Sequence, residues 1–599
     1  MHIATRTAAA ICLAATGLVT NAEDATSKDN LIITANRTPV ASHRVIAPVD
    51  VIDAATIERS MATELSELLR FRNGMDIIRL GGPGQLTSIF TRGTNSNHTL
   101  VLIDGVRINT GGLGLAAVQN ITPEMIERVE IVKSPRTTLY GENAIGGVIN
   151  VITRKPDGPE FGGFAGAGQD NAQKYGLSGG TTEGGFSISG RAQQLKNDGY
   201  PIVEGAPFDS GWDNTTVEAR AGYQATRWGI EGRIWNSDGA TEYVNWPLVP
   251  ASQDYENRII AVAGSAAFTS NWSSVVDLSF ATDDLEQQQS SEFAKTERTI
   301  LDWQNTVQIG GDNTLVAGAY LSNENVSGES FGFPLTAEDT DTIAVYVEDS
   351  VTLGHHALLL AGRYSDHDAI GQDFTWNIEY GFDITPDMRL TTGAGRAVRA
   401  PSASERFGAF GGNPKLEEEE ALTVQGGWQW TFTEHQGVTV DLFYTEIDNL
   451  IASDENFVLQ NIDKAEIKGI EAGYSFATLS WSFRATGVLQ DPENKTTSTK
   501  LLRRAEESAA FSLARNIGRH QVGVDLRLVG SRKDFGNQNL AGYGLTNLTG
   551  RFAFNDKWGL YGRIENLFDR DYTAAYFDYG VRYRSPGRGA YVELRYKLK

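Results

Sequence analysis

The chain has 599 residues, a formal net charge of −23, 64 glycines and a single cysteine. The chain is longer than a single soluble domain with one hydrophobic core usually is, so it forms either several domains or one very large barrel. The negative charge argues against nucleic acid as a partner, because proteins that bind nucleic acid neutralise its phosphates with lysine and arginine. Cys12 lies in a segment that we expect to be removed. Disulfides, cysteine–zinc sites and thiol catalysis are therefore excluded in the mature chain.

Residues 1–22 have the pattern of a secretory signal peptide. Arg6 precedes an apolar run over 8–19, and Thr20-Asn21-Ala22 supplies small residues for cleavage. The run is too short for a transmembrane helix, and no later window approaches about 18 apolar residues. A membrane role therefore requires a closed β-barrel, the only other structure that satisfies its backbone hydrogen bonds within lipid.

A short β-prone run stands in the polar leader, residues 23–45. It is Asp29-Asn30-Leu31-Ile32-Ile33-Thr34-Ala35. This run predicts an extended segment that is exposed near the N-terminus of the mature chain, where its unpaired backbone groups invite pairing. The alternative is an ordinary first strand of the next domain. The residues that follow lack hairpin signals, which favours an extended, unpaired segment.

Residues 46–155 predict a small α+β domain. Two short helices are expected, one after Asp53 as N-cap and one that stops at Gly74. Residues 99–109 predict a hairpin with a tight turn at Asp104-Gly105. Residues 125–133 and 146–155 predict further strands.

Residues 156–599 change to short alternating runs between polar or glycine-rich turns, the period of outer-membrane strands. All 11 tryptophans fall here, and Trp228, Trp272 and Trp558 each open a run after a polar turn. This placement predicts an aromatic girdle at the membrane interfaces, because the first 155 residues contain no tryptophan. The alternative is ordinary aromatic usage in a soluble β-sandwich or propeller.

The last run separates its two faces cleanly. One face is apolar and the other is charged, which suits lipid on one side and a wet lumen on the other. The apolar face carries Ala590, Val592, Leu594, Tyr596 and Leu598, and the charged face carries Glu593, Arg595, Lys597 and Lys599.

Several long stretches resemble one family. Residues 81–109 and 134–153 resemble the plug domain of TonB-dependent outer-membrane receptors, and four later stretches resemble their barrel: 396–420, 443–451, 461–471 and 566–572. Within the family the likeness is greatest to the receptors for cobalamin. Two departures stand out. The chain ends in Leu598-Lys599 where an aromatic residue is usual, and Glu418 stands where proline is usual.

The resemblance implies a transmembrane β-barrel of 22 antiparallel strands, with the α+β plug inside its lumen, in the outer membrane of a Gram-negative bacterium. It implies TonB-dependent active transport of cobalamin or another corrinoid, with residues 29–35 as the segment that TonB grips. A ferric siderophore receptor is the alternative within the family. A passive porin or adhesin barrel is the alternative of another class, and it predicts neither a plug nor the N-terminal strand.

The expected partners are TonB, outer-membrane lipid and the ligand, and we expect a monomer without a covalent cofactor. No nucleophile elbow or metallohydrolase motif is present, so an enzyme is not expected. Two glycine-rich loops, 81–88 and 110–116, are implied as the floor of the ligand site, with turn chemistry alone as the alternative. The residues concerned are Gly84, Gln85, Leu86, Thr87, Ser88, Gly112 and Leu113.

Two charged groups complete the expectations. The resemblance implies a plug–barrel ionic lock made by Arg92, Arg107, Glu130, Arg136 and Glu419. Solvated surface charge is the alternative. Clustered aspartates in outer loops suit calcium, which prefers oxygen ligands, but their spacing favours solvated loop carboxylates. They are Asp198, Asp209, Asp213 and Asp238.

Overall fold

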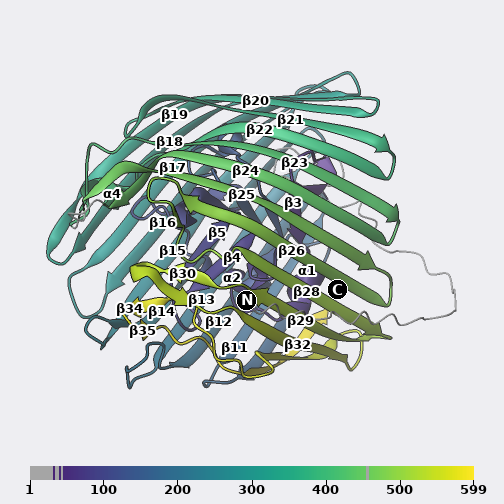
Figure 1. The fold of residues 1–599 in the computed structure, drawn as a ribbon. Coiled ribbons are helices and arrows are strands. Elements are labelled where there is room, and N and C mark those ends of the chain that lie inside the picture. Colours follow the sequence, from purple (N-terminus) through teal and green to yellow (C-terminus); the bar gives the residue numbers. More distant parts are fainter. Residues whose placement is uncertain (1–31, 34–39, 42–44, 410, 454–457, 599) are drawn as a thin grey trace, which may run out of the picture.

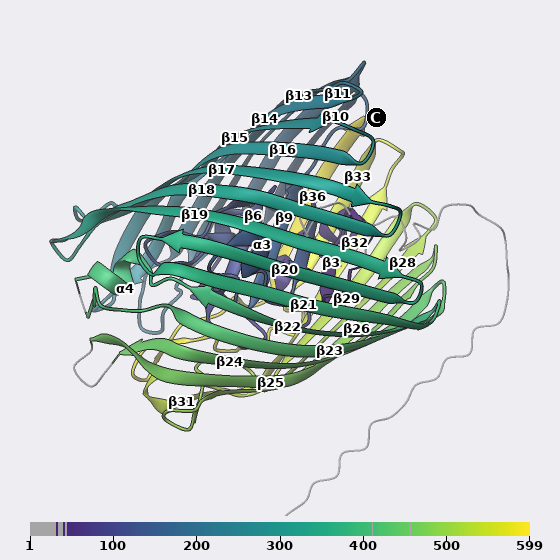
Figure 2. The ribbon, with the colours of Figure 1, turned by 90° about the horizontal axis from the view of Figure 1, so that it is seen from above.

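The structure, a computed structural model, describes residues 32–33, 40–41, 45–409, 411–453 and 458–598. The expected signal peptide, 1–22, lies outside these residues. A wide barrel encloses a smaller domain, which occupies the lumen (Figures 1 and 2). Among the described residues, no helix combines the length and hydropathy needed to cross a membrane.

The barrel is closed by 22 long antiparallel strands, as expected. The first and last strands pair along their length, with Phe161 opposite Leu598, and a two-residue strand β27 (Thr499–Lys500) pairs with the end of β26. The long strands are β10 (Glu160–Gly168), β11 (Gln173–Glu183), β12 (Phe186–Tyr200), β13 (Ser210–Gln224), β14 (Trp228–Asn245), β15 (Val249–Ala267), β16 (Trp272–Gln287), β17 (Phe293–Ile309), β18 (Asn313–Ser330), β19 (Phe333–Leu353), β20 (His356–His367), β21 (Gly371–Thr385), β22 (Met388–Arg399), β23 (Glu419–Thr433), β24 (Gln436–Ser453), β25 (Leu459–Ala477), β26 (Trp481–Asn494), β28 (Glu507–Ile517), β29 (His520–Val529), β32 (Tyr543–Ala553), β33 (Trp558–Glu565) and β36 (Gly589–Leu598).

The barrel wall is apolar outside and polar inside. On β36, Val592 and Leu594 are 48% and 39% exposed, whereas Glu593 is 4% exposed and faces the lumen. This confirms the parity predicted for the last strand. Trp228 and Trp558 open β14 and β33 and are exposed on the outer face. The outer face therefore has the aromatic and aliphatic surface of a wall in lipid.

The plug forms two small sheets flanked by short helices. The larger sheet has the strand order β3-β8-β9-β6-β7, and β4 pairs with β5. The described elements are β3 (Val49–Ile52), α1 (Ala54–Ser60), α2 (Leu65–Leu69), β4 (Met75–Arg79), β5 (Thr87–Thr91), η3 (Ser96–His98), β6 (Thr99–Ile103), β7 (Val106–Arg107), η4 (Val118–Asn120), η5 (Pro123–Met125), β8 (Ile126–Val132), α3 (Thr137–Tyr140) and β9 (Gly147–Thr153).

Most of the local structure predicted for the plug from its sequence is confirmed. Asp53 caps α1 by accepting a hydrogen bond from the Thr56 amide at 2.7 Å, and Asp104 and Gly105 both take positive φ in the predicted hairpin turn. The second helix is shorter than expected, because α2 ends at Leu69. Gly74 instead turns the chain with φ +65° against Glu471 of the barrel, where a side chain would collide.

The plug shares its hydrophobic core with one side of the barrel. Its central cluster includes Trp235 and Ile259 of the β14 and β15 wall, and a second cluster includes Val316 and Tyr346 of β18 and β19. A third joins Ile145 to side chains of β22 to β25. The apolar contact between plug and wall therefore runs from β14 to β25.

Loops at the barrel end away from Trp228 and Trp558 fold inward. They carry α4 (Ala403–Phe407), β30 (Arg532–Asp534), η6 (Phe535–Asn537), β31 (Gln538–Leu540), β34 (Tyr576–Asp578) and β35 (Val581–Arg582). Ala574 and Ala575 are buried against Ile78 and Phe90 of the plug. These loops therefore reach the plug itself.

Candidate functional site

The N-terminal strand is paired in the structure, which differs from the expectation. Strand β1 (Ile32–Ile33) pairs antiparallel with β2 (Val40–Ala41) through two residue pairs. Backbone donors and acceptors use any strand within reach, and here the nearest belongs to the same chain. The other residues of the run, Asp29, Asn30, Leu31, Thr34 and Ala35, lie outside the described residues.

The loop between β4 and β5 is fixed by hydrogen bonds to the plug and to the barrel, and it exposes one apolar side chain. The Gly84 amide donates to Glu64 Oε2 at 3.2 Å, and Gln85 Nε2 donates to the Glu242 carbonyl of β14 at 2.7 Å. Gln85 and Thr87 are buried and Ser88 is partly buried, so the first two shape the loop. Leu86 is 44% exposed and lies at the surface.

Gly84 has a specific steric role in this loop. It takes φ +74°, and a Cβ at this position would overlap the ring of Trp212 on the barrel wall. Only glycine allows the backbone to approach the wall this closely.

The second glycine-rich loop is tied to the barrel by its backbone. The Gly111 amide donates to Thr296 Oγ1 at 3.2 Å, and its carbonyl accepts from the Ala403 amide of α4 at 3.0 Å. The Gly112 carbonyl accepts from the Ser404 amide at 3.0 Å. Leu113 is 54% exposed. Leu86 and Leu113 are thus the exposed apolar tips of the two loops.

Arg92 anchors the plug to Glu471 of β25. Its Nε and Nη2 donate to the two carboxylate oxygens at 3.1 and 3.2 Å, and Lys133 Nζ lies 2.7 Å from the same carboxylate. The Arg92 guanidinium also stands 4.7 Å from the centre of the Phe443 ring. All three charged groups are buried, so each depends on the others for compensation.

Two further buried contacts join plug and barrel. Arg136 Nη1 lies 2.5 Å from Glu379 Oε1 of β21, and His98 Nε2 lies 2.7 Å from Glu419 Oε2 of β23. Arg399 supplies the positive charge beside Glu419 at 2.5 Å. Burial lowers the pKa of His98 although Glu419 opposes the shift. The neutral ring carries its proton on Nε2 and accepts the Asn95 amide at Nδ1.

The structure divides the expected ionic lock. Arg92, Arg136 and Glu419 do join plug and barrel, but Arg92 pairs with Glu471 and Glu419 with His98 and Arg399. Arg107 pairs with Glu142, within the plug. Glu130 pairs with Arg128 at 2.9 Å, also within the plug. These two ion pairs therefore join residues of the plug to one another, although Arg107 also lies near Glu324 of barrel strand β18.

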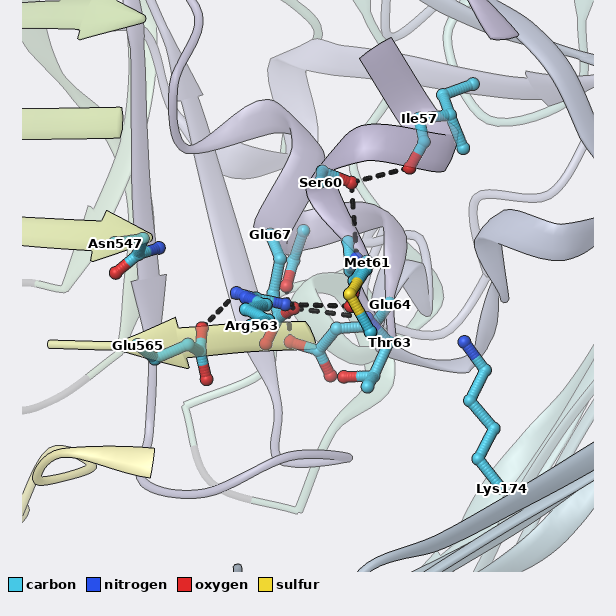
Figure 3. Close-up of polar contacts among 12 residues, drawn as sticks. Ile57, Ser60, Met61, Thr63, Glu64, Glu67, Lys174, Asn547, Arg563 and Glu565 are labelled. Carbon is cyan, nitrogen blue, oxygen red and sulfur yellow. Dashed lines mark hydrogen bonds and ion pairs between the residues drawn. The ribbon is translucent and has the colours of Figure 1, made fainter. Parts of the chain in front are cut away.

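Sequence reasoning missed a chain of alternating acidic and basic side chains that links the loop between β4 and β5 to the barrel. Figure 3 shows three of its members, Glu64, Glu67 and Arg563. Glu64, which accepts the Gly84 amide, also pairs with Arg79 at 2.5 Å. Arg79 lies 3.6 Å from Glu67, which pairs with Arg563 of β33 at 2.8 Å. Burial raises the pKa of Glu67, but Arg563 and Arg79 outweigh it and lower the pKa to about 2. In the sequence, Glu64 and Glu67 look like ordinary acidic residues at the start of a helix. Their role becomes visible only in the structure, through their ion pairs with Arg79 and Arg563.

The four aspartates of the calcium expectation do not share one ligand shell. Asp198 accepts from Asn171 at 2.8 Å and Asp238 accepts from Asn236 at 2.8 Å. Asp213 lies on β13, where the negative charge of Asp238 repels it, whereas Asp209 repels a different residue, Asp170. Within the described ranges, no group of three or more His, Cys, Asp or Glu side chains is arranged to hold a metal ion.

Comparison with known proteins agrees with this architecture. Residues 150–567 match the family profile "TonB dependent receptor-like, beta-barrel", and residues 42–148 match "TonB-dependent Receptor Plug Domain".

Curated relatives align over nearly the whole chain. The vitamin B12 transporter BtuB of Photobacterium profundum is 30% identical over 609 aligned residues, covering 96% of this chain and 97% of the relative. The protein of the same name from Vibrio vulnificus is 27% identical over 596 aligned residues, with the same coverage of 96% and 97%.

Solved structures share the fold. The siderophore receptor PiuA from Acinetobacter baumannii superposes with a TM-score of 0.80 at 17% identity, covering 96% of this chain and 100% of that one. A mutant of the ferric enterobactin receptor PfeA from Pseudomonas aeruginosa gives 0.79 at 16% identity, covering 92% and 98%.

Proposed function

Because this chain belongs to the TonB-dependent receptors of the Gram-negative outer membrane, we propose that its cargo is cobalamin or a related corrinoid. The observation that carries the proposal is the likeness to vitamin B12 transporters, 30% identical across 96% of the chain. The siderophore receptors PiuA and PfeA are only 17% and 16% identical, a level that reports the fold rather than the ligand.

In the proposed cycle, the ligand first settles on the two plug loops. Leu86 and Leu113 offer apolar contact, and the backbone of each loop is already fixed by hydrogen bonds to the barrel. A surface that is ordered before binding loses little conformational entropy when the ligand arrives. Glu64 then connects the first loop to Glu67 and Arg563, so that displacement of the loop acts on a plug–barrel contact.

TonB then supplies the work. It pairs with residues 29–35 by strand addition, in which backbone groups provide the grip. The two residue pairs between β1 and β2 must open first, because Ile32 and Ile33 already use part of their backbone there. Each backbone hydrogen bond is worth about 1 kcal/mol net, so a longer strand contributed by TonB outcompetes the short internal one.

A second candidate cargo is a ferric siderophore, the class of ligand for which the solved structures PiuA and PfeA are named. Calorimetric titration of the purified protein with cyanocobalamin and with ferric enterobactin tests the choice. We expect saturable binding of cyanocobalamin only. Binding of ferric enterobactin alone would replace the corrinoid proposal. Repeating the titration with and without calcium decides whether the outer-loop aspartates contribute.

A further inference from the structure

The plug is held differently on two sides of the barrel. From β14 to β25 the contact includes shared apolar clusters. Along β33, β36 and β10 to β12 the contacts are polar, for example Glu67 with Arg563 and Glu58 with Lys597 at 2.9 Å. None of the buried apolar clusters among the described residues joins the plug to these five strands.

Two cavities follow one another along this polar side. The larger, about 510 Å³, is lined by Glu58 and Glu124 of the plug and by β10 at 162–164. The smaller, about 50 Å³, is lined by Thr63 of the plug and by β10 at 166–167. Both also contact β11, β12 and β36, so they are successive spaces along one seam between plug and wall.

Lys174 of β11 closes the seam between the two cavities. It lines the smaller cavity, and its ammonium pairs with Glu124, which lines the larger. Glu593, on the wall of the smaller cavity, lies 3.6 Å from the same ammonium, and Arg595 lies 3.8 Å from Glu124. Figure 3 shows Lys174 extending from the barrel wall, apart from Thr63 of the plug.

The sequence explains why space remains here. The lumen-facing positions of β10 and β11 that line the two cavities include Gly162, Gly166 and Ser178, which fill little volume. On the opposite side, bulky residues such as Trp235 occupy the lumen-facing positions and pack into the plug.

We propose that the cargo passes between the plug and the wall formed by β36, β10, β11 and β12, when separation of Lys174 from Glu124 joins the two cavities. This rests on the proposed transport function. Polar contacts exchange readily for water as the plug shifts, whereas parting an apolar cluster exposes hydrophobic surface. The apolar side therefore acts as the hinge, and pulling by TonB widens the seam to the size of a bulky cargo.

Paired cysteines test the path, because the only native cysteine is Cys12. The test pair is Glu124→Cys with Lys174→Cys. The matched control is Asn120→Cys with Asn257→Cys, which replaces a plug–barrel contact of 2.7 Å on the β15 wall. Each pair is joined in whole cells by a short reducible thiol-to-thiol linker, and binding and uptake of radiolabelled cyanocobalamin are measured.

We expect the linked test pair to bind cyanocobalamin normally but to lose at least tenfold in uptake rate, with recovery on reduction. The linked control should stay within twofold of its reduced form. Equal loss in both pairs, or uninterrupted uptake through the linked test pair, overturns the path. Failure of the unmodified protein to take up cyanocobalamin contradicts the proposed cargo and is a separate result.

A second measurement needs no cargo. Lys174→Ala is compared with Arg233→Ala, which removes a basic side chain that contacts the Asp104 carbonyl from β14. In planar bilayers we expect Lys174→Ala to raise ion conductance at least threefold over the unmodified protein, and Arg233→Ala to leave it within error. Equal conductance of the two variants overturns the role of Lys174.

Discussion

The N-terminal strand and the seat of the plug are held with very different strength. Strand β1 is joined to β2 by two residue pairs, whereas the seat combines buried charge pairs at Arg92 and Arg136 with apolar clusters along β14 to β25. Removing one partner of a buried charge pair costs about 3–5 kcal/mol, several times a net backbone hydrogen bond. A pull from the N-terminus therefore frees the strand well before it disturbs the seat.

The largest expected effect comes from breaking the strand. Ile33→Pro removes a backbone donor and fixes φ, so the segment loses its ability to pair with a partner's sheet edge. We expect uptake of cyanocobalamin to fall at least a hundredfold while binding at the cell surface is unchanged. Ile33→Ala, which keeps the donor, is the control. Wild-type uptake by the proline variant would show that this strand is not the coupling segment.

The next largest effect comes from weakening the seat. Glu471→Ala leaves Arg92 and Lys133 buried without their shared carboxylate, which should destabilise the seat by about 3–5 kcal/mol. Denaturant titration of the plug in detergent should show the loss. Lys464→Ala, which breaks an exposed pair with Glu446, is the control and should cost less than about 1 kcal/mol. Equal effects would contradict the importance of buried pairing.

Acid provides a smaller, graded weakening of the polar contact between the plug and β33. The pKa of Glu67 is lowered to about 2 from an ordinary 4.5, so its pairing stabilises the folded state fully above pH 4.5. That contribution is lost as the pH falls from 4.5 towards 2, with a slope of at most about 1.4 kcal/mol per pH unit. Comparing plug unfolding of the wild type and Glu67→Gln between pH 6 and 2.5 isolates this group. Parallel curves would show that Glu67 contributes nothing pH-dependent.

The strand and the seat also differ in how far sequence predicts them. Barrel parity, the Asp53 cap and the Asp104-Gly105 turn were predictable, because each depends on residues close in the chain. The partner of Arg92 was not, since Glu471 lies 379 positions away and only the strand register brings it near. The contact between His98 and Glu419 was not predictable for the same reason, since 321 positions separate the two residues.

The pairing of β1 with β2 escaped prediction for a different reason. The residues between the two strands carry no compact turn signal, and the match involves only Ile32 and Ile33 with Ala41 and Val40. Such a short pair contributes little free energy, so propensity cannot specify it. The roles of Gln85 and Thr87 were also unpredictable, because their burial follows from how the loop meets the wall.

The smallest expected effect lies at the two glycine-rich plug loops, 81–88 and 110–116, which we propose bind the ligand and which present exposed apolar tips. Leu86→Ala and Leu113→Ala each remove about two to three methylene equivalents of apolar contact, worth about 0.8 kcal/mol each when fully buried, so each should weaken cyanocobalamin binding by about fiftyfold at most. Calorimetry measures the affinity. Uptake at saturating ligand should be unchanged, because neither side chain joins the plug to the barrel.

Thr87→Ala is the informative contrast, since its hydroxyl donates to the Gln85 carbonyl at 2.9 Å inside the loop. If Thr87→Ala weakens binding as much as Leu86→Ala does, loop shape matters as much as direct contact. No change in affinity for either leucine variant would place the ligand elsewhere.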